Sequence, residues 1–395
     1  MTRRVTVAER RARLARRHRL VPSHRVDDVA AITDSMVGLH SSDPATVYLS
    51  ATARMKRPSI AAVADALYEH RSVLRHHAMR RTLWVFTPQV ARLAHAACTA
   101  ALAPPEWTRL AKMVEDSEVA SDGAAWVAAA KRDTLAALHR AGEATTRQLG
   151  QLVPALRAPL HLAVGKAYAG QQGAHTRVLL NLGFDGLIVR GRSTGSWISS
   201  EYTWSPTDRW LPGGVVGADP VAAADELTRR YLAAFGPAST ADVQWWMGWT
   251  LGATKRALAS ISAVEVELDD GPAWVRADDT DPEVAVKPWI AFLPGLDSTT
   301  MGWKERAWYV GDHGGLGHSL FDRNGNGGPT VWVDGEIVGG WAQRQSGEIA
   351  HRLLKDIGRA RADAVAREAE RLRALIGAAR VNARFPAPIQ KELLA

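Results

Sequence analysis

The chain has a single cysteine among its 395 residues, Cys98, and it lies in the apolar stretch LAHAACTAAL. One cysteine excludes an intrachain disulfide and a zinc site made of cysteine thiolates. A lone cysteine among alanines and leucines is typical of a small buried core residue. Because disulfides mark oxidising compartments and this sequence can form none, we expect a cytoplasmic protein.

Other signals are missing as well. No apolar run reaches the ~18 residues that span a bilayer, and the arginine-rich N-terminus lacks the apolar centre of a secretory signal. The chain contains no Walker-type phosphate loop and no G-x-S-x-G serine elbow. The histidines have no metal-ligand spacing, since the adjacent His76 and His77 would point to opposite faces of a strand. The sequence therefore predicts no membrane span, no bound metal and no cofactor.

Basic residues, by contrast, are in surplus: 49 Lys and Arg stand against 41 Asp and Glu, a net charge of +8. Such a surplus is typical of proteins with an anionic partner, most often nucleic acid, although a basic protein without such a partner is equally compatible. Between Val7 and Leu20 the pattern predicts a helix with Arg10, Arg13 and Arg17 on one side. That face is either solvated or, as we favour, in contact with phosphates.

An internal repeat indicates the architecture. GEATTRQLGQLV begins at Gly142 and GPASTADVQWWMG at Gly236, and each follows an amphipathic helical stretch. In both, a glycine stands where a helix C-cap belongs, and a threonine, Thr146 or Thr240, stands where the next N-cap belongs. Each repeat continues into a third helical stretch and two β-like runs. Three helices followed by a two-stranded ribbon predict a winged helix, and the occurrence of the pattern twice in register argues against chance.

Turn signals predict where the ribbons reverse. The first ribbon is expected to turn at residues 193–195 (STG) and the second at residues 269–271 (DDG). The N-terminal third fits the same plan with two helical patterns and then SVLRHHAMRRTLWVFTP, a basic hairpin from Val73 to Thr87. Its polar crossing is placed at residues 75–77. A third winged helix is therefore predicted.

The remainder of the chain differs in texture. From Trp289 to Trp341 there are short β-like runs with many glycines, including a hairpin through Asp334-Gly335, which predict a small antiparallel sheet or barrel. From Ser346 to about Arg380 the pattern predicts a helix, and the tail FPAPIQKELLA an extended arm. We therefore predict an α+β fold of three tandem winged-helix modules, a small antiparallel β-barrel or sheet, and a C-terminal helix and arm, with boundaries at 1–105, 106–215, 216–285, 286–345 and 346–395.

The stretch VGLHSSDP carries four polar residues in a row. A helix that begins at Pro44 explains an N-cap at Ser42 or Asp43, because proline suits the first helical position. Capping does not require His40 or Ser41. These side chains are therefore candidates for chemistry.

Five arginines are candidate DNA contacts, because wings and helices of winged-helix proteins touch the DNA backbone and grooves. Three lie on the first predicted wing and two at the tip of the second: Arg75, Arg80, Arg81, Arg190 and Arg192. Binding should then be electrostatic and weakly dependent on sequence.

Six motifs along nearly the whole chain resemble the winged-helix DNA glycosylases of the AlkZ and YcaQ type: VGLHSSDP, MRRTLW, RWLPG, RRYLAAFGPASTADVQWWMG, LPGLDSTTMGWKER and PTVWVDGEIVGGW. The resemblance implies three winged helices in a C-shaped clamp plus a small β-barrel. It also implies a monomeric, nucleoid-associated bacterial repair enzyme without metal. Its reaction would be monofunctional hydrolysis of the N-glycosidic bond of alkylated or bulky-adducted purines in double-stranded DNA.

In that family the loop carries a glutamine-x-glutamine or glutamine-x-aspartate pair, and the matching positions here are His40 and Ser42. A neutral His40 would accept a proton from water as general base, a contribution of ~10²–10⁴-fold. Ser42 would orient the water, and Asp43 would act instead if it is not engaged in capping. Two alternatives stay open: a non-catalytic winged-helix DNA-binding protein, either a lesion sensor or a regulator, and hydrolysis by Asp297 of LPGLD.

Overall fold

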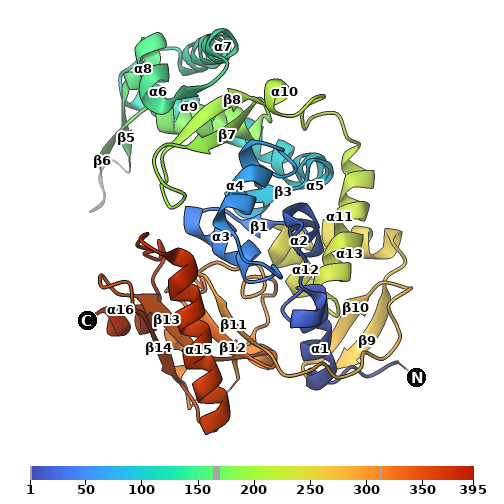
Figure 1. Ribbon diagram of the computed structural model, residues 1–395. Coiled ribbons are helices and arrows are strands. Elements are labelled where there is room, and N and C mark those ends of the chain that lie inside the picture. Colours follow the sequence, from blue (N-terminus) through green and yellow to red (C-terminus); the bar gives the residue numbers. More distant parts are fainter. Residues whose placement is uncertain (1, 163–169, 312–313) are drawn as a thin grey trace. The chain divides into compact units, whose positions relative to one another are not determined.

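A computed structural model of the protein describes residues 2–162, 170–311 and 314–395 (Figure 1). The chain divides into two units. The first comprises Met1–Val73, Trp84–Val90 and Asp225–Ala395, and the second comprises Leu74–Leu83 and Ala91–Ala224. Both units combine helices with small antiparallel sheets, as the predicted α+β class requires.

One order of elements occurs three times along the chain: helix, short strand or bridge, helix, helix, strand, strand. The first run consists of α2 (Val29–Ser35), β1 (Leu39–His40), α3 (Pro44–Thr52), α4 (Ile60–Tyr68), β2 (Leu74–Ala78) and β3 (Thr82–Phe86). The second consists of α7 (Gly123–Ala141), β4 (Ala144–Thr145), α8 (Thr146–Leu152), α9 (His175–Phe184), β7 (Ile188–Ser193) and β8 (Tyr202–Pro206). The third consists of α11 (Pro220–Phe235), a bridge at Ala238, α12 (Thr240–Met247), α13 (Leu251–Ser260), β9 (Val264–Leu268) and β10 (Gly271–Val275).

The three runs also share one strand pairing. In each, the short first strand or bridge pairs antiparallel with the last strand, and the residue of the last strand at that position is a tryptophan. The pairs are His40 with Trp84, Ala144 with Trp204, and Ala238 with Trp274. The repeat inferred from the sequence is therefore present in the structure, and it includes the N-terminal third.

The helix starts of the second and third runs are equivalent. Trp204 Nε1 donates to Thr146 Oγ1 over 3.0 Å, and Trp274 Nε1 donates to Thr240 Oγ1 over 2.9 Å. The two threonines thus match, as predicted, but each is the first helical residue and not the N-cap. The N-caps are the preceding residues, each in a capping box: Thr145 and Ser239.

In the second unit, β2, β7, β8 and β4 follow one another in an antiparallel sheet. The ribbon β7–β8 does not turn at residues 193–195 as predicted. Ser193 pairs with Tyr202, so the connection spans residues 194–201. In the third run the prediction is confirmed, because Leu268 pairs with Gly271 across a two-residue turn.

The predicted crossing at residues 75–77 is wrong. These residues lie inside β2, and the crossing is the turn η2 (Met79–Arg81), where Arg80 and Arg81 have φ values of 57° and 61°. The prediction places the crossing at polar residues because polar residues are common in turns. Here the polar residues His76 and His77 are buried inside the strand. The two rings have different neighbours, as expected for opposite faces: His76 Nε2 lies 3.2 Å from His95 Nδ1, and His77 packs edge-on against Phe184.

The core of the second unit lies among its helices. Helices α7, α8 and α9 bury Leu138, Leu149 and Val178 among one another. The hairpin of β5 and β6 is inserted between α8 and α9. The other elements of the second unit are η3 (His95–Thr99), η4 (Ala100–Leu102), α6 (Ala103–Asp116), η5 (Pro154–Arg157), β5 (Pro159–Leu162), β6 (Gly170–Gly173) and α10 (Thr207–Trp210). Helix α5 (Pro88–Ala94) precedes η3. Cys98 is buried, as predicted.

The first unit contains a four-stranded antiparallel sheet in the order β11 (Ile290–Leu293), β12 (Thr330–Val333), β13 (Glu336–Gln343) and β14 (Ile349–Leu353). The predicted hairpin through Asp334-Gly335 is confirmed, and both residues have positive φ, 51° and 89°. The chain between β11 and β12 is helical in part, as α14 (Ala307–Val310) and η6 (Leu316–Leu320), where β-like runs were predicted.

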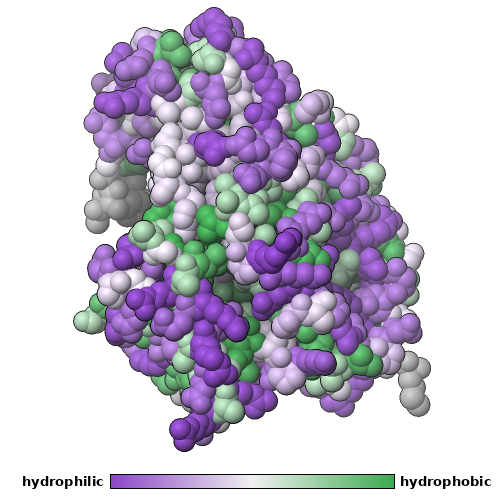
Figure 2. Space-filling view, viewed as in Figure 1, coloured by the Kyte–Doolittle hydropathy of each residue, from purple (hydrophilic) through white to green (hydrophobic). Residues whose placement is uncertain are grey.

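Two predictions for the C-terminal region are wrong. Residues 349–353 form β14 because they pair with β13, and the helix α15 begins only at Arg359 and ends at Ile376. The tail is not an extended arm but contains α16 (Pro388–Leu394), whose Gln390 Nε2 donates to the Pro329 carbonyl over 2.9 Å. Pairing and burial with distant residues thus outweigh the local pattern. The exposed residues of α15 are largely charged, and the surface of this helix that faces the viewer in Figure 2 is mainly hydrophilic.

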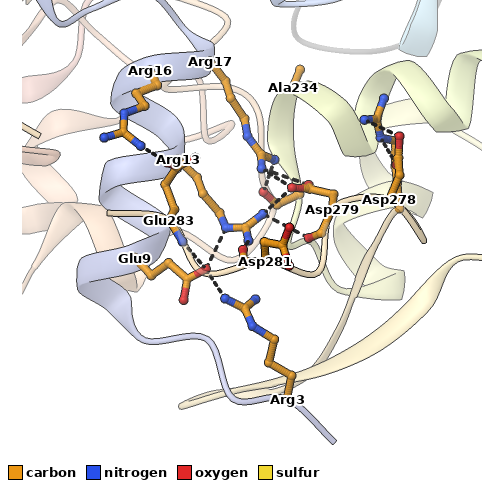
Figure 3. Close-up of polar contacts among 12 residues, drawn as sticks. Arg3, Glu9, Arg13, Arg16, Arg17, Ala234, Asp278, Asp279, Asp281 and Glu283 are labelled. Atoms are coloured by element: carbon orange, nitrogen blue, oxygen red, sulfur yellow. Dashed lines mark hydrogen bonds and ion pairs between the residues drawn. The ribbon is translucent and has the colours of Figure 1, made fainter. Parts of the chain in front are cut away.

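Helix α1 (Val7–Arg17) corrects our expectation of a phosphate-binding face. Arg13 donates to Glu9, Asp279 and the Asp281 carbonyl, and Arg17 forms an ion pair with Asp279 (Figure 3). Arg10, only 3% exposed, lies over the ring of Trp308 at 4.2 Å. Arg13 and Arg17 thus connect the N-terminal helix to the segment after β10. Among the described helices, none combines the length and the apolar run that crossing a bilayer requires.

Candidate functional site

The loop after β1 differs from its counterparts in the other two runs. There, the residue opposite the tryptophan is followed directly by the N-cap of the next helix, Thr145 or Ser239. In the first run the residue opposite Trp84 is His40, and the N-cap is Asp43. Two additional residues, Ser41 and Ser42, therefore separate strand and helix. The four polar residues are a strand end, a two-residue insertion and a cap.

His40 is 3% exposed and its ring centroid lies 4.9 Å from that of Trp84. The Ser42 backbone N–H points at His40 Nδ1 over 3.4 Å. A nitrogen that accepts a hydrogen bond carries no proton in the neutral ring, so this contact favours the tautomer protonated at Nε2. The distance is long for a hydrogen bond, so this contact is weak.

Asp43 acts as the helix cap, as one of the two predicted candidates. Its Oδ1 accepts the Ala45 backbone N–H over 3.1 Å, and its Oδ2 accepts the Arg384 backbone N–H over 3.0 Å. Burial raises the pKa of the Asp43 carboxyl, while these two hydrogen bonds work in the opposite direction. Arg384 also donates through Nη1 to the Ser42 carbonyl over 3.1 Å. The C-terminal segment thus holds the loop at two points that no sequence pattern indicated.

The segment that contains LPGLDST supports the loop and α3 from the other side. Thr46 Oγ1 donates to the Gly295 carbonyl over 2.6 Å, and Ser298 Oγ donates to the Gly38 carbonyl over 2.8 Å. The Ser298 contact joins two of the six motifs in space, and the two contacts together set the position of β1 relative to α3.

Asp297, the alternative catalytic residue, is fully buried beside Arg54. Arg54 donates to both of its carboxylate oxygens, over 2.8 and 3.0 Å, and the hydroxyl of Ser50 and the N–H of Thr299 complete the set. Burial raises the pKa of Asp297, but the charge and hydrogen bonds of Arg54, together with the hydrogen bonds from Ser50 and Thr299, outweigh burial and hold this pKa below the usual range. With its lone pairs engaged and no exposed surface, Asp297 has a structural role.

A cavity of about 250 Å³ adjoins the loop. Asp43, Ala45 and Thr46 at the start of α3 form one side of it. Prolines 294 and 329 with Trp341 form a second side, and residues 381–394 close it. Asp43 is therefore part of both the loop and the cavity wall.

The structure places two of the five predicted DNA-contact arginines side by side in the sheet of the second unit. Arg75 in β2 is paired with Arg190 in β7, and both guanidinium groups lie near the Tyr202 ring, at 4.9 and 5.3 Å from its centroid. Arg190 also lies 5.2 Å from the Trp204 ring. Arg75 is only 2% exposed, so its side chain offers little surface to a ligand.

The other three predicted arginines lie at the ends of strands. Arg80 and Arg81 form the η2 turn, and the side chain of Arg81 is 48% exposed while it contacts Glu106 over 3.2 Å. Arg192 is exposed near the end of β7, two residues before the connection begins. Arg81 and Arg192 are therefore exposed near the ends of ribbons, whereas Arg80 is half-buried.

A groove of about 1080 Å³ in the second unit gathers further basic residues that the sequence did not single out. Arg147 of α8, Arg157 of η5, His175 of α9 and Arg190 of β7 line it together, with Glu201 as the acidic residue of the lining. In the described part of the chain, neither Arg147 nor Arg157 has a carboxylate within ion-pair distance, unlike the arginines of α1. Their spacing along the sequence is irregular, which explains why no pattern revealed them.

The described residues bring no three His, Cys, Asp or Glu side chains together in an arrangement that could hold a metal ion.

Comparisons with known proteins follow the same outline. A family model described as "DNA glycosylase AlkZ-like" matches residues 33–375. Among solved structures, the chain is similar to the Streptomyces sahachiroi DNA glycosylase AlkZ, with a TM-score of 0.71 and 18% sequence identity over 97% of this chain and 99% of that one. At this identity the likeness establishes a shared fold. No curated protein matches the chain.

Proposed function

Because the chain belongs to the AlkZ-like DNA glycosylase family, we propose that it is a monofunctional DNA glycosylase acting on alkylated or bulky-adducted purines in double-stranded DNA. The observation that carries the proposal is the insertion of Ser41 and Ser42 at a point where the other two runs have only a helix cap. Capping requires neither the two inserted serines nor the histidine that stands opposite the buried Trp84, because Asp43 already caps the helix.

The three runs of elements are, in this proposal, three winged-helix modules, and the four-stranded sheet is the small β domain. The order of helix, strand, helix, helix and two-stranded ribbon supports this interpretation, as does the shared pairing of first and last strands. A clamp of such modules would bind one damaged duplex as a monomer.

Hydrolysis needs a leaving base, a positioned water and stabilisation of positive charge on the sugar. A purine alkylated on a ring nitrogen is already cationic, so it leaves without a strong general acid. Water attacks the sugar carbon as the carbon–nitrogen bond breaks, and the base departs with the bonding electrons. His40 accepts the water proton at Nδ1, where water displaces the long contact from the Ser42 N–H, and the Ser42 hydroxyl orients the water.

The basic residues of the second unit support binding to the DNA backbone. Arg147, Arg157 and Arg190 line one groove, and Arg192 lies exposed on the same ribbon as Arg190. Guanidinium groups suit phosphate because their planar N–H donors match its oxygens. Such contacts fix the position of the duplex without specifying its sequence.

The test is a base-release assay. The protein is incubated with a duplex that contains N7-methylguanine and with a duplex that carries a bulky purine adduct, and abasic sites are detected by alkaline strand cleavage. We expect abasic sites from at least one duplex, and loss of their formation in the His40→Ala variant. Binding of adducted DNA without any base release would instead support the alternative, a lesion sensor built on a glycosylase fold.

A further inference from the structure

The cavity beside Asp43 has the size and chemistry of a small-molecule site. Its volume of about 250 Å³ is slightly below the range of drug-sized pockets, so it suits a molecule of one or two rings. We propose that this cavity receives the ring of an N-alkylated purine, with the Asp43 carboxylate facing its positive charge. The identity of the ring rests on the proposed function, and the occupancy of the cavity does not.

The walls favour a flat, apolar ligand. Pro294, Pro329 and Trp341 line one side, and Val381 and Pro386 line the side formed by the C-terminal segment. The proline rings present flat apolar surfaces to a heterocycle, and Trp341, which is 1% exposed, supports this wall from the core. A base that has left its stack loses contacts worth a few kcal/mol, and such walls replace them.

The polar groups in the wall are largely satisfied by the protein itself. Gln343 accepts the Val381 N–H over 2.7 Å and donates to the Gly347 carbonyl over 3.4 Å. Gln390 bridges the Ala387 N–H and the Pro329 carbonyl, over 3.0 and 2.9 Å. These amides therefore support the wall and are not available to read the edge of a ligand. Recognition has to come from shape and from charge.

Asp43 supplies the charge. Both donors to its carboxylate are neutral backbone amides, so two hydrogen bonds leave lone pairs unused. Arg384 contacts the carboxylate through its backbone N–H, and its guanidinium donates to the Ser42 carbonyl. Burial raises the pKa of Asp43, and the two backbone hydrogen bonds and the charge of Arg384 offset burial only in part. A further cation beside this carboxylate would therefore stabilise its charged form. Lys391, also in the wall, is exposed at the edge.

The test uses free ligands, so it is independent of DNA cleavage. The fixed cation 7,9-dimethyladeninium and its neutral counterpart 9-methyladenine are titrated into the protein by isothermal calorimetry. We expect the cation to bind with a Kd below about 1 mM and at least about tenfold more tightly than the neutral base. Asp43→Asn keeps the helix cap through its amide oxygen but loses the acceptor for the Arg384 N–H, and it should abolish the preference for the cation. A smaller loss of affinity for 9-methyladenine than for the cation separates the lost charge from any shift of the wall.

A cavity-filling pair of variants locates the site. Ala383 lines the cavity and is half-buried, so Ala383→Leu should weaken both ligands by about tenfold or more without unfolding the protein. Ala379 is equally half-buried in the same segment but is not part of the lining, and Ala379→Leu is the matched control. Thermal unfolding of each variant shows that the fold is retained.

The outcomes separate the two proposals. If neither ligand binds, or if Ala383→Leu binds both as well as Ala379→Leu does, the cavity is not a base receptor, even when abasic sites form on damaged DNA. If the cation binds with the expected dependence on Asp43 and Ala383 while no damaged duplex loses a base, the cavity proposal holds and the glycosylase proposal fails.

Discussion

His40 lies directly opposite Trp84 in the β1–β3 pair, where the other two runs have alanine opposite tryptophan. Alanine at position 40 should therefore be compatible with the fold, because alanine occupies the equivalent position in the other two runs. We expect His40→Ala to lower base excision by about a hundredfold with little change in stability or in lesion-DNA affinity, because the lost interaction belongs to the transition state. Single-turnover kinetics and equilibrium binding measure the two separately.

Ser42→Ala is the comparison for that variant. A hydroxyl orients water but does not take its proton, so the loss should be smaller than for His40→Ala. If His40→Ala is as active as the unmodified protein, His40 does not act as the base.

Breaking the buried ion pair of Arg54 and Asp297 should strongly destabilise the first unit. Asp297→Asn leaves the Arg54 charge buried without its partner, which costs about 3–5 kcal/mol. Asp27→Asn is the matched control, because Asp27 pairs with an Arg57 side chain that is 88% exposed, and such pairs contribute little. Chemical denaturation measures both. Equal effects of the two substitutions would contradict the structural role of Asp297.

Buried histidines predict how stability depends on pH. Burial lowers the pKa of His18 to about 3 and that of His76 to about 3. Between about pH 6.5 and pH 3 the unfolded chain binds protons at these positions and the folded chain does not, so acidification favours unfolding. Each histidine should contribute a slope of about 1.4 kcal/mol per pH unit in that window, with full stability above it.

His18→Gln removes one of these titrations. The free energy of unfolding, measured by denaturant titration from pH 7 to pH 4, should then fall less steeply, by the slope of one histidine. His24→Gln, at an exposed position, is the control variant. An unchanged slope in His18→Gln would show that His18 is not held neutral in the folded protein.

Arg147 and Arg157 should contribute to the salt dependence of DNA binding. Each phosphate contact that is removed lowers the slope of log affinity against log salt by about 1. Replacing both residues with alanine should therefore lower the slope by about 2, equally for duplexes of different sequence. Arg367→Ala on the exposed side of α15 removes the same charge and should leave the slope nearly unchanged. A strong preference for one undamaged sequence would instead indicate a regulator.

The repeat could be predicted because its signals are local. Gly142, the turn before Gly271 and the alternating runs are read from a few neighbouring residues, and the structure has them at the expected places. The N-cap of α8 is Thr145, one residue before the predicted Thr146. Both threonines are suitable caps, and the capping box with Gln148 decides between them. The turn between β7 and β8 differs from the prediction because Ser193 pairs with Tyr202, which lies seven residues beyond Gly195.

The roles of charged residues were harder to predict. An arginine face on α1 has the same pattern whether it meets solvent, phosphate or protein, and its partner Asp279 is more than 250 positions away. Arg75 is predicted at the crossing of the first hairpin, but it lies inside β2, where it pairs with Arg190. The support of Asp43 by Arg384 comes from a backbone N–H, which every residue except proline provides. Contacts of this kind leave no trace in the sequence.

The link between Arg384 and Asp43 has a consequence for biosynthesis. The loop with His40 is among the first parts of the chain to be made, but the residues that hold it and close its cavity, 381–394, are made about 340 residues later. Synthesis proceeds at about 5–20 residues per second, so for tens of seconds the nascent chain carries the polar loop without its support. A ribosome that stalls before residue 384 would leave a protein with most of its fold and an incomplete site.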